Sequence, residues 1–510
     1  MTTAHICIMI AIIIYLGAML FVGYLCSKQN NDTSDFYLGG RKLGPLVTAM
    51  SAEASDMSSW LLMGLPGLAY LSGIADAGWT AIGLAIGTYL NWKIVAKRIR
   101  LYTHVAGNSI TLPSFFSNRF RDDRRILPSI GAIFIVIFFI PYTASGFAAC
   151  GKLFSSLFGV KYLTAMIISA LIIVGYTTLG GFLAASTTDF IQSIIMSIAL
   201  IIVFGFGVSV AGGPDAVISH AKSLPGYLTM MTTYNPETGT EAAYPLINIV
   251  SMLAWGLGYF GMPHVLLRFM AIEDVKKLKL SRRVATVWVV ISMFVAVFIG
   301  VVGNAMSKVG VIPTLEDPET IIIVVAGVIS QHGVLAAIVA GLILAGILAA
   351  TMSTADSQLL AASSSASQNI LKEVFMKDMS EKTGMLIARI TVLIIALIGV
   401  FIARDPNSSV FQIVSFAWAG FGASFGPLVL MALFWKRSTL QGALAGMVSG
   451  GVMVFVWKFL VRPIGGSWNI YELLPAFIIA SLFIVVVSLL TPEPEQEIYD
   501  EFDKVKRMTN

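Results

Sequence analysis

The stretch SAEASDMSSWLLMGLPG, residues 51–67, places two carboxylates and four serines directly before an apolar run that contains glycine and proline. An ionisable side chain at membrane depth is costly, so Glu53 and Asp56 indicate a function if this stretch spans a bilayer. Glycine and proline weaken a helix and leave backbone carbonyls free. The stretch therefore predicts a membrane helix with a polar interruption. The alternative is that either carboxylate lies near the lipid headgroups and pairs with a base.

The composition of the whole chain is typical of a membrane protein. Of its 510 residues, 57% are hydrophobic and 12% are charged, whereas about a quarter of the residues of soluble domains are charged. The net charge of +5 requires no nucleic acid, because cytoplasmic loops of membrane proteins collect Lys and Arg. The three cysteines and five histidines form no disulfide framework, metal motif or catalytic cluster. We therefore expect neither an enzyme nor a cofactor.

Apolar segments long enough to cross a bilayer recur along the chain. A helical span needs about 20 apolar residues, because only internal hydrogen bonds satisfy a backbone in lipid. By this measure we predict thirteen spans, at 5–26, 45–72, 77–96, 127–157, 161–183, 186–212, 246–271, 284–307, 333–364, 384–403, 409–435, 440–461 and 470–491. The first lacks the basic start and cleavage site of a signal peptide, so we expect it to be retained.

Lysine and arginine are concentrated in the loops on one side of the predicted bundle. The loop 97–126 holds seven of them and the loop 272–283 holds five, whereas the loop 213–245 holds Lys222 alone. Loops rich in Lys and Arg face the cytoplasm. We therefore expect the N-terminus outside the cell and the acidic C-terminal tail in the cytoplasm.

The predicted spans contain an internal symmetry. After the first span, two groups of five follow, and each begins with an interrupted segment, the second being WGLGYFGMPH at 255–264. Because five is odd, the groups enter the membrane from opposite sides, and broken helices at matching places in an inverted repeat indicate a transporter's binding site. The predicted regions are a leading helix with a cytoplasmic loop (1–44), the first repeat (45–212), an extracytoplasmic loop (213–245), the second repeat (246–435), two trailing helices (436–491) and a cytoplasmic tail (492–510).

Two further segments carry polar side chains at predicted membrane depth. In GILAATMSTADSQLL, residues 346–360, Ser353 and Thr354 can face another helix or bond carbonyls four residues earlier in their own helix. Asp189 follows the interruption LGGFLAASTTD at 179–189, and it can serve an ion-exit path or cap a helix.

Aromatic residues cluster near both predicted breaks. Trp255, Tyr259 and Pro263 follow one another at four-residue spacing, which places them on or near one face of a helix. Trp60 follows the first break, and Tyr142 lies in the middle of the fourth span. Such rings around an unwound backbone can form a cage for a small solute with an apolar body. The alternative is that they belong to the interfacial aromatic belts of membrane helices.

Several strings resemble the sodium:solute symporter family, namely SDMSSWLLMGLPG, TTLGGFLAAS, WGLGYFGMPHVLLRFM, ILAATMSTADSQLL, VSFAWAGFGASFGP and WKRSTLQGALAGMVSGG. The resemblance runs in order from about residue 34 to about residue 490. It is highly specific for the family, and within the family it is closest to the proline carriers. It implies an all-α membrane fold of about 13 transmembrane helices, with a five-plus-five inverted-repeat core of the leucine-transporter type, one leading helix and two trailing helices.

The same resemblance implies a function in the cytoplasmic membrane of a bacterium. The chain would import L-proline coupled to Na⁺ by alternating access, and the alternative is another small solute such as a sugar, pantothenate or a carboxylate. The implied partners are L-proline, Na⁺ and the lipid bilayer, with no nucleic acid, cofactor or obligate protein partner.

The resemblance also implies roles for individual residues. Sodium would be bound by backbone carbonyl and hydroxyl oxygens of five residues: Ala54, Met57, Ala350, Ser353 and Thr354. Coupling and the inward path of the ion would involve Asp56, Ser58 and Asp189. The solute would be framed by Trp60, Tyr142, Trp255, Tyr259 and Pro263.

Three residues depart from the pattern of the proline carriers. Ser59 and Glu53 stand where those carriers have glycine, and Asp356 stands where they have an uncharged residue. All three adjoin the implied ion site. We therefore expect ion binding and its pH dependence to differ in this chain.

Overall fold

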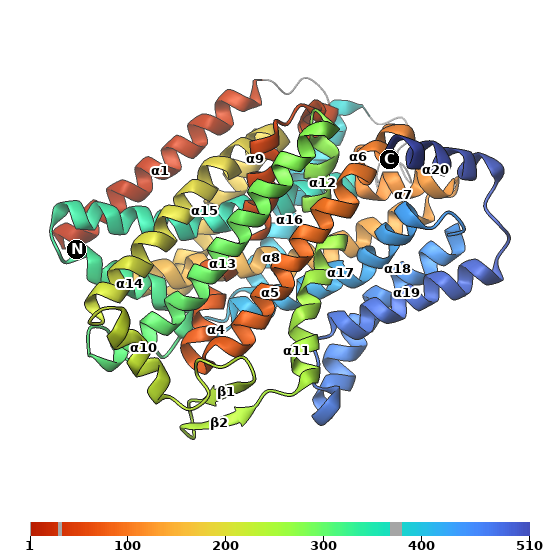
Figure 1. Ribbon diagram of the computed structural model, residues 1–510. Helices are drawn as coiled ribbons and strands as arrows, with labels where there is room; N and C mark the ends of the chain where they lie inside the picture. Colours follow the sequence, from red (N-terminus) through yellow and green to blue (C-terminus); the bar gives the residue numbers. More distant parts are fainter. Residues whose placement is uncertain (1, 29–32, 368–379, 510) are drawn as a thin grey trace.

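The structure is a computed structural model that describes three ranges of the chain: residues 2–28, 33–367 and 380–509. The gaps fall within the predicted regions 1–44, 246–435 and 492–510, and those parts of the prediction lie outside the described residues. The described chain is almost wholly helical, and its long helices run side by side in one bundle (Figure 1). A two-stranded hairpin, β1 (Thr232–Asn235) and β2 (Thr240–Ala243), lies at one end of the bundle (Figure 1).

The long helices follow the predicted grouping. The segment 5–26 corresponds to α1 (Thr3–Ser27). The first group of five corresponds to α3 (Pro45–Asp56) with α4 (Leu65–Ser72), α5 (Ile74–Leu90), α8 (Ile126–Phe158) and the two parts of α9 (Tyr162–Val210) on either side of Gly181. The second group corresponds to α11 (Leu246–Leu253) with α12 (Pro263–Ala271), α13 (Leu278–Lys308), α15 (Val334–Ser364), α16 (Glu381–Ile402) and α17 (Val410–Phe434). Two more helices follow, α18 (Leu440–Val456) and α19 (Leu473–Leu490).

The first helix of each group is interrupted, as predicted. α3 ends where Met57 takes φ −74° and ψ 69°, and the chain resumes through a π-helical turn, Trp60–Gly64, that leads into α4. In the second group a 3₁₀ segment, Ala254–Gly261, follows α11, and α12 restarts after Met262 with Pro263 in its first turn. The second pair bends by 47°. Both breaks leave backbone groups without partners in their own helix.

The predicted boundary between the fifth and sixth spans is wrong in its position. The predicted spans end at 183 and begin again at 186, whereas α9 runs through both and breaks at Gly181, with φ 67° and ψ −174°. Glycine adopts this conformation readily because it has no Cβ.

The segments between the spans contain helices that the sequence analysis does not predict. They are α2 (Thr33–Leu38), α6 (Ala96–Val105), α7 (Leu112–Phe120), α10 (Pro214–Ser223), α14 (Ile321–Ser330) and α20 (Gln496–Thr509). α20 belongs to the predicted acidic tail, and it packs against α6 through the buried side chains of Ile498, Phe502 and Val505. Their spacing of four and three residues is the pattern of one helix face.

Within the described residues, eight helices are long and apolar enough to cross a bilayer, and nine if the bent pair in 246–271 counts as one span. Shorter apolar helices, among them Trp60–Ser72 and Pro318–Ser330, fall below that length. The protein is thus a multi-pass membrane protein, and the count of thirteen spans stays a prediction.

Glycines set the distance between α5 and the broken segment of the second group. A Cβ on Gly87 would overlap the backbone of Gly256, and a Cβ on Gly83 would overlap Leu253. We expect Gly87→Val to lower the free energy of unfolding by about 1–3 kcal/mol, because the backbone atoms that the new side chain would overlap cannot move aside easily. The melting temperature of the purified protein in detergent measures this. Gly205→Val is the control, since nothing lies within 4 Å of a Cβ there, and equal melting temperatures for the two variants would contradict the prediction.

Candidate functional site

The interruption of α3 lies against α15. Ser353 donates a hydrogen bond from its Oγ to the backbone oxygen of Ala54, at 2.8 Å, and lies 3.2 Å from that of Ala350. Thr354 donates to the backbone oxygen of Ala350, at 3.0 Å. All four residues are buried. Each hydroxyl therefore bonds a carbonyl of its own helix, and Ser353 also bonds a carbonyl of the facing helix α3. Both alternatives predicted for these hydroxyls hold in part.

Met57 completes the predicted group of oxygen atoms. Because its backbone leaves helical geometry, the carbonyls at the end of α3 lie at a helix C-terminus, where the helix itself supplies no donors. Unwound carbonyls and helix C-terminal ends are the groups that coordinate Na⁺ in transporters with broken helices. The five residues predicted to bind Na⁺ thus lie on two facing segments, α3 with its break and α15.

Asp56 is the point at which the predicted aromatic residues meet. Its backbone oxygen accepts hydrogen bonds from Tyr142 Oη, at 3.1 Å, and from Trp60 Nε1, at 3.3 Å. Its Oδ2 accepts a hydrogen bond from Tyr259 Oη, at 2.7 Å. Asp56 is fully buried and bonds a tyrosine, so the alternative of a headgroup carboxylate paired with a base is wrong for this residue. Ser58 supports the same turn, since its Oγ accepts from the backbone N–H of Trp60, at 3.4 Å.

Trp255 lies between the buried aromatic residues and an open vestibule. Its ring centroid is 6.1 Å from that of Trp60 and 5.0 Å from that of Tyr471. A pocket of about 680 Å³ reaches Trp255 and is also lined by Phe411 and Tyr471. Pro263 is buried one turn beyond Tyr259 and starts α12. The predicted aromatic residues are thus buried together, and Trp255 is the one among them that lines this pocket. The alternative that they form interfacial belts is wrong for them.

Trp255 is supported by residues that the sequence does not predict. Trp418 donates from its Nε1 to the backbone oxygen of Trp255, at 2.8 Å, and its ring meets that of Tyr259 edge-on at 5.1 Å. Phe411 packs on Trp255 at a centroid distance of 5.2 Å. Trp418 stands in the string VSFAWAGFGASFGP, which carries the family resemblance, but nothing in a single sequence pairs it with a residue so distant along the chain.

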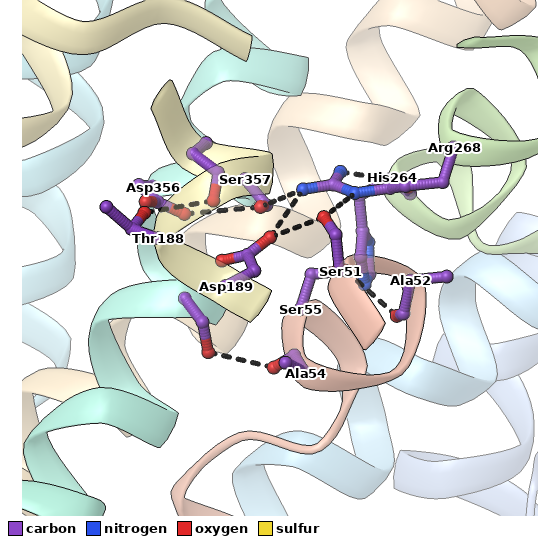
Figure 2. Close-up of polar contacts among 12 residues, drawn as sticks. Ser51, Ala52, Ala54, Ser55, Thr188, Asp189, His264, Arg268, Asp356 and Ser357 are labelled. Carbon is purple, nitrogen blue, oxygen red and sulfur yellow. Dashed lines mark hydrogen bonds and ion pairs between the residues drawn. The ribbon is translucent and has the colours of Figure 1, made fainter. Parts of the chain in front are cut away.

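A buried ion pair joins both repeats next to α3 (Figure 2). Asp189 Oδ2 lies 3.1 Å from Arg268 Nη2 and accepts a hydrogen bond from Ser51 Oγ at 2.7 Å. Arg268 also donates to Ser51 Oγ, at 3.0 Å, and to Ser357 Oγ, at 2.5 Å. Ser357 in turn donates to Asp356 Oδ1, at 3.2 Å. Four helices, α3, α9, α12 and α15, therefore meet at one guanidinium group.

Asp189 lies within α9, eight residues beyond the break at Gly181, so the alternative that it caps a helix is wrong. Arg268 is a residue that sequence reasoning misses, although a lone arginine in the apolar run VLLRFM is a visible signal. An arginine in a membrane span needs a charged or polar partner, and here that partner comes from the other repeat.

The residues that depart from the proline carriers lie around this site. Glu53 Oε1 accepts a hydrogen bond from Trp92 Nε1, at 2.8 Å, so the alternative of pairing with a base is wrong for this carboxylate as well. Ser59 is fully buried beside the break. Asp356 belongs to the Arg268 network through Ser357. Glu53 thus connects α3 to the π-helical turn Asn91–Val95.

Two groups of five helices, each opening with a broken helix at a buried polar site, define a membrane transporter. The fold is similar to that of a substrate-bound, outward-open Na⁺-coupled sialic acid symporter, with a TM-score of 0.77 and 18% identity over 96% of this chain and 99% of that one. It is also similar to Mhp1, a nucleobase-cation-symport-1 family transporter, with a TM-score of 0.52 and 13% identity over 92% and 98% of the two chains. These similarities confirm the predicted five-plus-five fold.

The sequence pattern of the sodium:solute symporter family matches residues 36–450, and the chain belongs to this family. It is 43% identical to the sodium/proline symporter of Haemophilus influenzae over 98% of this chain and 97% of that protein. It is also 43% identical to the high-affinity proline transporter PutP of Bacillus subtilis, over 95% and 98% of the two chains. The predicted family is confirmed.

Removing Arg268 would leave the carboxylate of Asp189 buried without its counter-charge. We expect Arg268→Met to lower the free energy of unfolding by about 3–5 kcal/mol, the usual cost of breaking a buried pair from one side. The double variant Asp189→Asn with Arg268→Met should regain part of that loss, as measured by denaturant unfolding in detergent micelles. Lys277→Met, which removes an exposed pair with Glu273, is the control and should change little. A double variant no more stable than Arg268→Met would refute this account.

Proposed function

We propose that this protein imports L-proline together with Na⁺ down the electrochemical gradient of the ion. The observation that carries the proposal is the contact of α15 with the broken helix α3, where the Ser353 hydroxyl meets the Ala54 carbonyl directly beside the aromatic cluster on Asp56. Relatives that are 43% identical over nearly their whole length are named as proline transporters. An oxygen-rich site and an aromatic cage side by side suit a cation and a small solute with an apolar body.

In this proposal Na⁺ binds between α3 and α15. Its ligands are backbone and hydroxyl oxygens of Ala54, Met57, Ala350, Ser353 and Thr354. The hydroxyls now donate to carbonyls of the same group, so a bound cation would take over these oxygens while the hydroxyl protons turn away.

The solute lies beside the ion. The aromatic residues Trp60, Tyr142, Trp255 and Tyr259, with Pro263, frame it, and the vestibule that ends on Trp255 admits it. Asp56 and Ser58 couple the two ligands, because Asp56 bonds three of these aromatic residues while its helix carries Ala54. Asp189, released from Arg268, lies on the inward path of the ion.

Transport follows from alternating access, without covalent chemistry or a cofactor. Sodium holds α3 and α15 together and completes the solute cage, so each ligand raises the affinity for the other, and this coupling is reciprocal. One charge moving through 100 mV releases about 2.3 kcal/mol, which supports roughly fiftyfold accumulation of solute before the sodium gradient is counted.

The proposed setting is the cytoplasmic membrane of a bacterium, with the N-terminus outside and the tail 492–510 inside. The concentration of Lys and Arg in the loops 97–126 and 272–283 supports this orientation. The proposed divisions are the leading region 1–44, the repeats 45–212 and 246–435 around the outer loop 213–245, and the trailing helices 436–491. Apart from proline, Na⁺ and lipid, no obligate partner is proposed.

Purified protein in proteoliposomes tests the function. We expect labelled proline to accumulate with an inward sodium gradient and only to equilibrate without one, because the ion supplies the driving force. Counterflow against a panel of proline, sugars, pantothenate and carboxylates identifies the solute. Exchange of another solute but not of proline would overturn the choice of proline while keeping the sodium coupling.

Ser353→Ala and Thr354→Ala test the sodium site. Each should raise the sodium concentration for half-maximal uptake about tenfold or more, because a polar contact to a charged group contributes roughly 1.5–3 kcal/mol. Ser363→Ala is the matched control, since Ser363 lies on the same helix and bonds Leu360, a carbonyl of that helix. Unchanged sodium dependence in both test variants, with normal membrane insertion, would refute the site.

A further inference from the structure

A strongly basic pocket lies at the Lys- and Arg-rich face of the bundle. It has a volume of about 320 Å³ and is formed where the π-helical turn after α5 meets the start of α13. Five basic side chains line it, namely Lys93, Lys97, Lys276, Lys279 and Arg282. None of the described residues that line it is acidic. Like charges held this close repel each other, so the pocket favours an anion.

The acidic side chains nearby are engaged elsewhere. Glu273 pairs with Lys277 at 2.6 Å, and Asp274 accepts from the backbone N–H of Lys276 at 2.8 Å. In the part of the chain that the structure describes, none of the five basic residues forms an ion pair with a carboxylate. Lys97 donates to the backbone oxygen of Thr509, so the end of α20 lies at the rim of the pocket.

An apolar groove along the same two helices distinguishes a lipid from a soluble anion. α5 and α13 lie side by side (Figure 1), and a groove of about 230 Å³ between them is lined by residues such as Ile82, Val290 and Phe294. Tyr89 stands on α5 between the groove and the pocket, with Lys93 Nζ at 5.4 Å and Arg282 Cζ at 5.5 Å from its ring centroid.

We propose that this basic pocket binds the phosphate headgroup of an anionic phospholipid, whose acyl chains run from the pocket along α5 and α13 toward the apolar groove. Anionic lipids are attracted to basic residues at the cytoplasmic ends of membrane helices, and basic pockets between such helices bind their headgroups. The lipid touches the transport machinery through one side chain. Trp92 lines the pocket and donates to Glu53, the residue before Ala54 on α3.

Native mass spectrometry of the full-length protein tests the binding. The protein is titrated with phosphatidylglycerol and with phosphatidylcholine of the same acyl chains, and we expect it to retain phosphatidylglycerol preferentially. The double variant Lys279→Gln with Arg282→Gln should weaken phosphatidylglycerol binding about thirtyfold, as two lost basic contacts predict. It should leave phosphatidylcholine binding unchanged. If the double variant does not fold, each single variant should show about a fivefold loss.

The control variant is Arg124→Gln with Lys436→Gln, which removes the same charge from exposed positions elsewhere on this face. It should bind phosphatidylglycerol as the unaltered protein does. If it loses as much affinity for phosphatidylglycerol as the pocket variant, net charge alone explains the effect and the proposed site is overturned. Equal retention of the two lipids by the unaltered protein would also overturn it. In a final experiment inorganic phosphate is added to the lipid-bound protein, and it should not displace phosphatidylglycerol. Displacement would show that the pocket binds a soluble anion and would overturn the lipid site.

Discussion

A backbone carbonyl inside a bilayer has no water to bond, so a helix can break there only where other groups satisfy the exposed oxygens. The break in α3 meets this requirement with side chains from other helices. Ser353 serves the carbonyl of Ala54, and Tyr142 and Trp60 serve that of Asp56. The groups that make the break tolerable are therefore also the groups proposed to bind the ion and to frame the solute. Stability of the break and the proposed function thus depend on the same groups.

Buried charges must also have partners, because leaving a charge unpaired costs more free energy than leaving a carbonyl unpaired. Asp189 and Arg268 are almost wholly inaccessible and come from different repeats. Ser51 and Ser357 extend the pair to α3 and α15, the two segments of the proposed sodium site. A movement that separates these helices must therefore also rearrange the ion pair. This links the ion pair, on the proposed inward path of the ion, to the relative position of the two repeats.

Much of the fold could be predicted from the sequence, because the relevant signals are local. The polar run at 51–59 and the glycines and proline of WGLGYFGMPH mark both breaks, and hydropathy marks the helices. The predicted boundary lies a few residues from the break at Gly181, because Gly180 and the small residues Ala184, Ala185 and Ser186 look alike as break positions in the sequence. The helix α20 was missed because the charge of its exposed face hides the spacing of Ile498, Phe502 and Val505.

The sequence by itself determined the class of protein, the inverted repeat and the segments of the candidate site, since apolar length, helix breakers and buried polarity are properties of short stretches. Only the tertiary structure decided which groups meet. Ser353 and Ala54 are 299 residues apart, and nothing local pairs Arg268 with Asp189, or Trp418 with Trp255. The tertiary structure also turned Glu53 toward Trp92 and gathered three aromatic residues on Asp56. Such pairings depend on how whole helices pack, and packing is a property of the complete chain.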